Sequence, residues 1–245
     1  WSSDVCSSYL PSAVTVITDD EIKKYGHRTL AEVLRSARGF YATSDRNYTY
    51  LGLRGFDRPG DYNSRFLLLV NGHRLNDNVY DSAFVANEFP LDLDLVDRVE
   101  IIRGPSSSIY GNNAFFGVIN VVTKQGRDLT GVEASGAVGS FGSYLGRFTV
   151  GKKYSDEVEV LLSGSLYDSA GPERLFFPEF NTPAQNNGIA TKADYEHFFN
   201  LFGSLRLGDF TLEASFHDRR KGIPDRKSTR LNSSHIPLSR MPSSA

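Results

Sequence analysis

A glycine-proline-serine segment is the first place where the residue types of this chain could do chemistry. Gly104 and Pro105 precede three consecutive serines, and proline suits the first turn of a helix, so a short helix over Ser106 to Tyr110 is expected. Free N–H groups at such a turn could bind a phosphate. The segment lacks the Gly-Lys-Ser/Thr ending of a P-loop, so a nucleotide enzyme using it is a remote alternative.

No other arrangement of nucleophiles, bases or metal ligands is convincing. The serines have no Gly-x-Ser-x-Gly elbow around them, and His73 follows a turn where solvent is its simplest partner. His197 and His217 fall on different expected strands, and the only cysteine is Cys6. We therefore expect no catalytic residue, no metal site and no cofactor.

Two turn-rich loops carry side chains suited to binding a ligand. Asp, Asn and Tyr side chains on loops offer hydrogen bonds and flat stacking faces above a rigid scaffold. Ordinary solvated turns explain any single one of these residues equally well. The candidate ligand-binding residues are Asp57, Arg58, Tyr62 and Asn63 in the first loop and Asn76, Asp77, Tyr80 and Asp81 in the second.

The totals leave most fold classes open and exclude a few functions. The chain has 245 residues, which suggests one or two domains, and its net charge of −2 argues against a nucleic-acid-binding face. No apolar run approaches the ~20 residues of a membrane helix. Aromatic residues make up 12% of the chain, which suits many short strands as well as a soluble β-sandwich.

The first half alternates short apolar strands with turns. A threonine followed three residues later by glutamate, at Thr18 and again at Thr29, predicts two capped helices, ended by Gly26 and by Gly39. Asn71-Gly72 after an apolar run predicts a tight hairpin. A polar, aromatic stretch over Phe40 to Tyr48 is expected to be a loop. The expected strands are Val14 to Ile17, Tyr50 to Arg54, Phe66 to Val70, Val96 to Ile102 and Val118 to Thr123.

After Lys124 the pattern changes to a strict period of two, which puts each apolar set on one face of a strand. The five alternating segments are Val132 to Val138, Tyr144 to Val150, Val158 to Leu166, Leu201 to Leu207 and Phe210 to Phe216. Short links alternate with a long one, Asp168 to Glu196, as periplasmic turns and extracellular loops do in membrane barrels. A soluble sandwich would explain the alternation equally well.

Several motifs in a fixed order resemble the plug domain of TonB-dependent outer-membrane receptors. They are Pro11 to Thr18, Leu53-Arg54-Gly55-Phe56, the Asn71-Gly72 hairpin, Val99-Glu100-Ile101-Ile102-Arg103-Gly104-Pro105, Tyr110-Gly111 and Gly117 to Lys124. The resemblance implies an α+β plug, a small mixed sheet with short helices, over residues 11–125. Residues 126–226 would then be the first antiparallel strands of a transmembrane β-barrel.

The resemblance also implies that the chain is a fragment. Plugged outer-membrane transporters have about 22 strands, whereas the sequence shows five. Residues 1–10 and 227–245 are Ser-rich and without pattern, and we expect both to be non-native tails. The motif that couples such receptors to their energy source would precede Leu10.

By resemblance, the protein imports a scarce, bulky nutrient across the outer membrane of a Gram-negative bacterium and is not an enzyme. A ferric siderophore is the leading ligand class, ahead of cobalamin, haem and glycans, and the expected partners are a TonB-type periplasmic energy-coupling protein and outer-membrane lipid. A soluble periplasmic or surface binding module with a β-rich second half is the alternative.

The resemblance assigns roles to a few charged residues. Arg54 and Arg103 each end a strand before a glycine, and the arginine that matches Arg103 faces acidic residues on the inner barrel wall of such receptors, so both are expected to contact the barrel. The residues expected to line the barrel lumen are Glu133, Arg147, Glu157 and Glu159.

Overall fold

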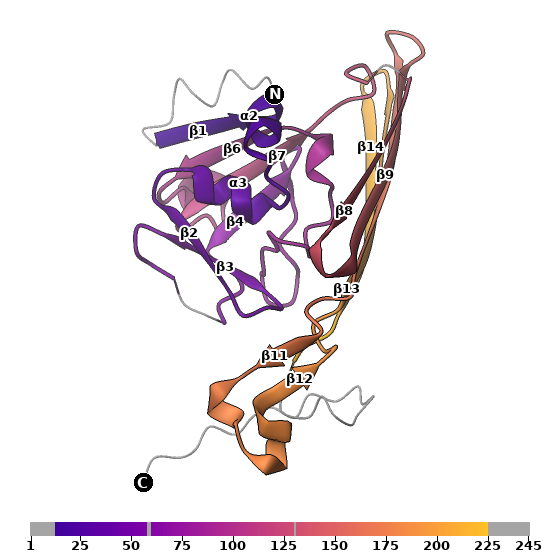
Figure 1. The fold of residues 1–245 in the computed structure, drawn as a ribbon. Helices are drawn as coiled ribbons and strands as arrows, with labels where there is room; N and C mark the ends of the chain where they lie inside the picture. Colours follow the sequence, from indigo (N-terminus) through magenta and orange to yellow (C-terminus); the bar gives the residue numbers. More distant parts are fainter. Residues whose placement is uncertain (1–12, 58–59, 130, 225–245) are drawn as a thin grey trace.

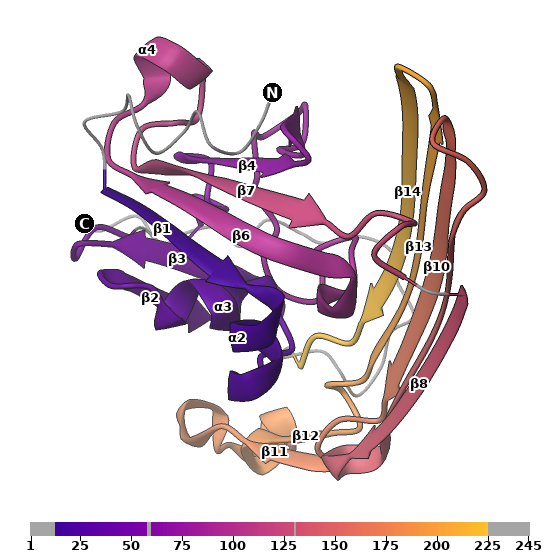
Figure 2. The same ribbon diagram turned by 90° about the horizontal axis from the view of Figure 1, so that it is seen from above.

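A computed structural model describes residues 13–57, 60–129 and 131–224 of the chain. The segments 1–10 and 227–245, which the sequence analysis interprets as non-native tails, lie outside the described residues. The described chain forms an N-terminal unit and, beside it, a separate sheet of long strands (Figures 1 and 2).

The N-terminal unit is built on a mixed sheet of five strands in the order β1-β6-β7-β4-β5. Its strands are β1 (Ala13–Thr18), β4 (Phe66–Val70), β5 (His73–Arg74), β6 (Val96–Arg103) and β7 (Gly117–Thr123). The sheet is mixed because β4 and β7 run parallel while the other pairs are antiparallel. Every residue of β4 is buried, as its run of Phe, Leu and Val predicts.

Local signals in the sequence set the turn and the first helix of this unit. Asn71 and Gly72 have φ angles of 49° and 82° and join β4 to β5, so the predicted hairpin is confirmed. Helix α2 (Asp19–Tyr25) begins at the predicted capping box of Thr18 and Glu21, in which each side chain accepts from the other's backbone N–H. It ends at Gly26 in the left-handed conformation.

The second predicted capping box is only half formed. At the start of helix α3 (Leu30–Ser36), Thr29 accepts from the N–H of Glu32, but the Glu32 carboxylate accepts from the N–H of Arg28 instead of that of Thr29. The helix ends with Ala37 as its C-cap rather than at Gly39, because the chain turns there into the next strand.

The expectation of a loop before the third strand was also wrong. The stretch expected to be a loop, Phe40 to Tyr48, contains strand β2 (Phe40–Ser44), which pairs antiparallel with β3 (Thr49–Leu53). Its alternation is weak, because the strand runs from buried Phe40 to exposed Ser44. Short helices η1 (Leu93–Leu95) and α4 (Ser107–Tyr110) complete the unit.

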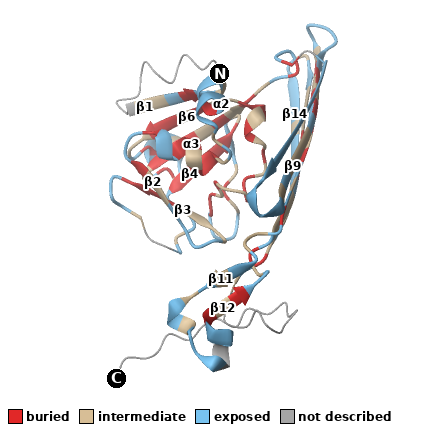
Figure 3. Ribbon diagram, in the orientation of Figure 1, coloured by how far each residue is buried: buried red, intermediate tan, exposed pale blue. Residues whose placement is uncertain are grey.

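The separate sheet, called the wall below, contains all five strands that the period-two pattern predicts. They are β8 (Gly131–Gly139), β9 (Ser143–Lys153), β10 (Val158–Ser169), β13 (Glu196–Leu207) and β14 (Phe210–Lys221), in the order β14-β13-β10-β9-β8 and antiparallel throughout. On β10 the outward-pointing Leu162 is 55% exposed while its inward neighbours Leu161 and Ser163 are buried. The exposed Leu201, Leu212 and Phe216 extend this apolar outer face over β13 and β14. Figure 3 shows that buried residues are concentrated in the N-terminal unit and that most of the wall is exposed.

The long connection between β10 and β13 carries a small hairpin, β11 (Arg174–Phe176) with β12 (Ile189–Thr191). This hairpin lies at one end of the molecule, called the outer end below (Figure 1). The tight turn between β13 and β14 lies at the opposite, inner end. Among the residues that the structure describes, no helix is both long enough and apolar enough to cross a membrane.

Candidate functional site

Aromatic side chains from three separate loops and from strand β3 meet at the outer end of the N-terminal unit. The Tyr48 ring contacts Tyr62 edge-on at a centroid distance of 5.1 Å and stacks on Phe84 at 6.2 Å. Tyr50 lies 5.9 Å from Tyr62. We call Tyr48, Tyr50, Tyr62 and Phe84 the aromatic cluster. Of these four residues, sequence reasoning identified only Tyr62 as a candidate. Tyr48 and Tyr50 are two positions apart at the start of a predicted strand, and this spacing is the signal that could have placed both rings on one face.

A carboxylate beneath the cluster holds the β2–β3 turn in shape. Asp45 accepts from the N–H groups of Asn47 (2.9 Å) and Tyr48 (2.6 Å) and from the hydroxyl of Tyr50 (2.7 Å). Burial opposes the ionised form of Asp45, but these hydrogen bonds outweigh it and lower its pKa. Burial and the bond to Asp45 raise the pKa of Tyr50, whose phenol therefore stays protonated.

Asn63, a predicted ligand residue, is buried beneath its loop. Its Oδ1 accepts from the N–H of Leu51 at 2.6 Å, and its Nδ2 donates to the carbonyls of Thr49 (2.9 Å) and Ala83 (2.8 Å). These bonds fix the loop that presents Tyr62 against β3. The side chain thus positions the site rather than facing solvent, and its ligand contact stays a prediction.

Asn76 has the same role in the second loop. It is buried, accepts from the N–H of Leu68 at 2.9 Å, and donates to the carbonyls of Phe66 (3.0 Å) and Asp81 (2.9 Å). An asparagine side chain that uses both amide hydrogens and its oxygen in this way ties a loop to a strand.

Asp77 organises the tip of this second loop. Burial alone would raise its pKa, but hydrogen bonds from the N–H groups of Tyr80 and Val79 and from Ser82 lower the pKa to about 2. The loop consequently holds Tyr80 76% exposed at the surface. Asp81 forms an ion pair with Arg74.

The remaining predicted residues of the first loop are only partly placed. Asp57 is half-buried and accepts from the hydroxyl of Thr43 at 3.2 Å. Arg58 lies outside the described residues.

Charged side chains join the aromatic cluster's turn to the wall at the outer end. Arg46 Nη1 lies 2.9 Å from an oxygen of Asp194, which also pairs with Lys221 of β14. Arg219 donates to Glu196 at 2.8 Å and to the carbonyl of Asn47 at 3.0 Å. These residues were not found from the sequence, because the contacts between the turn and the wall, Arg46 with Asp194 and Arg219 with Asn47, join positions more than a hundred residues apart.

A second contact with the wall lies deeper. Arg147 on β9 is largely buried and places its guanidinium 3.2 Å from Asp94 of η1 and 3.3 Å from Glu133 of β8. It also donates to the hydroxyl of Thr149 at 2.9 Å. The Arg147 guanidinium on the wall therefore binds two carboxylates, one from the N-terminal unit and one from the wall itself.

An apolar contact joins the unit and the wall further along β10. Leu129 and Leu161 belong to the same buried cluster as the core of the N-terminal unit. The chain passes close to the wall there, because a Cβ on Gly126 would meet the carbonyl oxygen of Val160 at 2.3 Å. The unit and the wall thus share one core through Leu161 of β10 and Phe202 of β13.

Comparison with known proteins decides what this arrangement is. Residues 8–118 match the family model described as TonB-dependent Receptor Plug Domain. The chain carries the plug domain of a TonB-dependent receptor. Receptors of this family lie in the outer membrane of Gram-negative bacteria and are transport receptors, not enzymes, so the predicted localisation is confirmed.

Solved receptor structures share the fold of the plug together with the wall. The ferric-catecholate import receptor of E. coli K12 matches with a TM-score of 0.59 and 21% identity over 86% of this chain and 27% of that chain. The receptor FpvA of P. aeruginosa, bound to a pyoverdine, matches with a TM-score of 0.64 and 16% identity over 87% of this chain and 26% of that chain. The ferric yersiniabactin uptake receptor of Yersinia pestis matches with a TM-score of 0.56 and 22% identity over 85% of this chain and 31% of that chain. The wall is thus part of an unclosed barrel, and the chain spans about a quarter to a third of these receptors.

The two arginines expected to join plug and barrel make no such contact with the described strands. Arg103 donates to the carbonyl of Arg38 (3.0 Å) and the hydroxyl of Thr15 (2.9 Å), both within the plug, and the end of β6 that carries it points away from the wall (Figure 2). Arg54 is exposed and has a φ of 54°. Their role at the barrel stays a prediction.

The predicted lumen residues divide into three kinds. Glu133 and Arg147 lie on the inner face of the wall and contact each other. Glu159 is buried on that face and accepts from the N–H of Arg127 at 2.7 Å. Glu157 precedes β10 in an exposed turn.

The serine-rich segment does not keep its N–H groups free for a phosphate. The N–H of Gly104 donates to Phe116 at 2.8 Å and that of Ser106 donates to Ala114 at 2.9 Å. Helix α4 has only four residues. Within the described ranges, no group of three or more His, Cys, Asp or Glu side chains could hold a metal ion.

Proposed function

We propose that the receptor carrying this chain imports a ferric siderophore across the outer membrane. The observation that carries the proposal is the aromatic cluster, which a plug domain presents at its outer end beside the long loop of the wall (Figure 1). A bulky chelate has an apolar, often flat periphery, for which tyrosine faces and neighbouring hydrogen-bonding groups are suitable partners.

The similar structures support this ligand class. The E. coli protein is named a ferric-catecholate import receptor, the Yersinia protein a ferric yersiniabactin uptake receptor, and P. aeruginosa FpvA is seen with a pyoverdine-iron complex. Cobalamin, haem and glycans are the other ligand classes, and no observation favours any of them.

The proposal assigns the ligand contacts to side chains of the two turn-rich loops. The exposed Tyr62 and Tyr80 supply faces, Asp57 supplies a polar group, and Asp77 with Asp81 holds the second loop in place. Arg58, which lies outside the described residues, stays a candidate contact. Transport energy would come from a TonB-type periplasmic protein acting near the N-terminus of the plug. The plug would cover residues 11–125 and the barrel would begin in residues 126–226, with the apolar outer face of the wall against lipid.

Iron uptake by cells that express the complete receptor tests this function. Radiolabelled iron is offered as a catecholate, a hydroxamate or a mixed chelate, with and without the TonB-type protein. We expect uptake of at least one ferric chelate that depends on the coupling protein. Coupling-dependent uptake of cobalamin or haem alone, or none of any compound, would refute the proposal.

Substitutions in the aromatic cluster test the site itself. Replacing Tyr62 by Ala removes a ring at the centre of the cluster, and we expect binding of the chelate to weaken roughly 2–10-fold. Tyr25→Ala is the matched control, because Tyr25 is also exposed but lies on α2. Equal affinities in both variants would place the ligand elsewhere.

A further inference from the structure

The base of the long connection between β10 and β13 is built around one buried carboxylate. We call this connection, residues 170–195, the outer loop. Asp194 lies just before β13 begins, and its side chain is 9% exposed. A Cβ on Gly171, at the other end of the loop, would overlap the carbonyl oxygen of Asp194, and the N–H of Gly222 donates to the carbonyl of Tyr195 at 2.8 Å. The two ends of the outer loop are therefore packed together beside the end of β14.

Asp194 joins the outer loop to both the wall and the plug. Lys221 of β14 donates to one carboxylate oxygen of Asp194 and to its backbone carbonyl (3.1 Å), and both side chains of this pair are 9% exposed. Arg46, on the β2–β3 turn of the plug, places Nη1 2.9 Å from the other carboxylate oxygen and is 48% exposed. The bond to the wall is buried, whereas the bond to the plug is half in water. The plug side of this joint is therefore the easier one to change.

The turn that carries Arg46 also carries a ring of the aromatic cluster. Tyr48 stands two residues further along the turn and contacts Tyr62 edge-on. Asp45 holds the turn in one shape, because it accepts from the N–H of Tyr48 at 2.6 Å and from the hydroxyl of Tyr50 at 2.7 Å. A shift of the Tyr48 ring must consequently shift Arg46 as well.

The outer loop bends from the end of the wall towards the side on which the plug lies, in both views of the fold (Figures 1 and 2). Its two legs are also bonded to each other, because the N–H of Lys192 donates to the carbonyl of Glu173 at 2.9 Å. The loop therefore moves as one piece about its base, and the base is where Asp194 lies.

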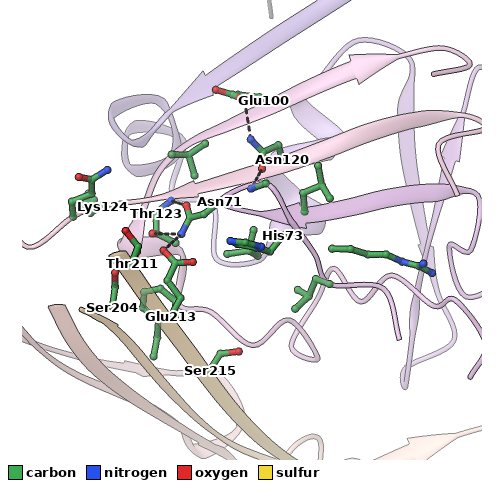
Figure 4. A pocket seen from close by; sticks show the side chains of 18 of the residues that line it. Asn71, His73, Glu100, Asn120, Thr123, Lys124, Ser204, Thr211, Glu213 and Ser215 are labelled. Carbon is green, nitrogen blue, oxygen red and sulfur yellow. Dashed lines mark hydrogen bonds between the residues drawn. The ribbon is translucent and has the colours of Figure 1, made fainter. Parts of the chain in front are cut away.

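A second bond between the plug and β14 lies at the inner end, away from this joint. Asn71 donates to Glu213 at 2.8 Å, and Figure 4 shows these two side chains directed at each other. Glu213 precedes Lys221 by eight positions, or about 26 Å along an extended strand. It is a carboxylate on the same strand that also bonds the plug, so it provides a matched comparison for the joint at Asp194.

We infer that Asp194 is a positioning residue that couples the outer loop to the aromatic cluster. A ligand seated on the cluster fixes Tyr48 and with it Arg46, and the Arg46–Asp194 pair then steadies the base of the outer loop. By thermodynamic linkage, the steadied loop retains the ligand to the same degree. Asp194 acts through Arg46 and does not itself touch the ligand. This inference rests on the proposed import function.

Hydrogen exchange of the complete receptor tests the coupling. The informative amides are those of β11 and β12, measured with and without a ferric catecholate, a ferric hydroxamate and a mixed ferric chelate. Arg46→Gln is the main variant, because it removes the bond to the plug and leaves the buried pair of Asp194 with Lys221 in place. Arg46→Lys keeps the positive charge, and Glu213→Gln is the matched control at the inner end.

We expect a bound chelate to slow exchange in the outer loop of the unmodified receptor and of Glu213→Gln. Arg46→Gln should lose most of this protection, and Arg46→Lys should recover part of it. The chelate should also dissociate roughly 2–5-fold faster from Arg46→Gln, as the loss of a half-exposed ion pair allows, with its association rate unchanged. Equal protection in Arg46→Gln and the unmodified receptor, no protection in the unmodified receptor, or an equal loss in Glu213→Gln would overturn the inference.

A second comparison needs no chelate. Without any ligand, Arg46→Gln should speed exchange in β11 and β12, whereas Glu213→Gln should not. Unchanged exchange in Arg46→Gln would contradict the link between the turn and the outer loop, whatever the receptor transports. A receptor that neither binds nor imports any of the three chelates would instead refute the proposed function.

Discussion

Arg147 offers a sharp test of how the plug is held, because removing the cation and removing its partners should have unequal costs. Its side chain is only 8% exposed, whereas Asp94 and Glu133 are 39% and 50% exposed. In Arg147→Gln both carboxylates are left where water can solvate them. The loss is then two half-exposed ion pairs, worth about 0–1 kcal/mol each, and part of the bond to Thr149.

The sum for Arg147→Gln is about 1–2 kcal/mol, or roughly a 5–30-fold change in the population of the opened plug. The double variant Asp94→Asn with Glu133→Gln instead leaves a buried guanidinium without a counter-charge. Breaking a buried pair in this way costs about 3–5 kcal/mol, so the opened population should rise about a hundredfold or more.

Hydrogen exchange of the complete receptor measures the two changes directly. The informative amides are those of η1 and the first residues of β6, since their exchange reports local release of the plug. Lys153→Gln is the control: it removes a cation from the same strand whose partner, Asp156, is 97% exposed. Faster exchange in Arg147→Gln than in the double variant would refute the reasoning that burial, rather than the number of contacts, sets the cost.

Three further predictions concern the plug. Gly126→Ala should destabilise the plug–wall contact by about 1–3 kcal/mol because its Cβ would overlap Val160 O, while Gly136→Ala, with its nearest atom at 3.8 Å, should change exchange little. Burial raises the pKa of the Glu88 carboxyl. Its contribution to stability is therefore present below the usual carboxyl pKa and is lost as the pH rises through the raised pKa. Glu88→Gln should remove this loss of stability, measured as hydrogen exchange of the plug between pH 4 and 8, and an unchanged pH profile would contradict the prediction. Asn63→Ala should cost about 1–3 kcal/mol for each buried backbone group left unpaired, seen as faster exchange in β3; unchanged exchange would show that the side chain does not hold the loop.

The elements that the sequence predicts correctly are those whose signal is local. The capping box at Thr18, the Asn71-Gly72 turn and the five alternating strands each depend on residues a few positions apart. Strand β2 was missed because its small and polar residues do not alternate, and its pairing with β3 is what makes it a strand.

The site was predicted less completely for the same reason. The loops that carry Tyr62 and Tyr80 were identified, but Tyr48 and Phe84 join Tyr62 only through the fold. A composition rich in Asp and Asn could not tell which side chains face solvent. Asn63 is buried by its hydrogen bonds, whereas Tyr80 is exposed because Asp77 holds its turn.

The contacts between the plug and the wall also constrain how force can move the plug. Burying side chains such as Leu129, Leu161 and Phe202, which share one core with the plug, stabilises the contact by about 1.5–3 kcal/mol each. The hydrogen bonds between β14 and the plug, from Asn71 to Glu213 and from Arg219 to the carbonyl of Asn47, contribute about 0.5–1.5 kcal/mol each. A pull applied near the N-terminus is transmitted through β1 and β6 into the sheet of the plug, since these strands are paired along their length. The weaker contacts open first, so displacement of the plug should begin at the hydrogen bonds with β14 and reach the shared core around Leu161 and Phe202 only under a larger load.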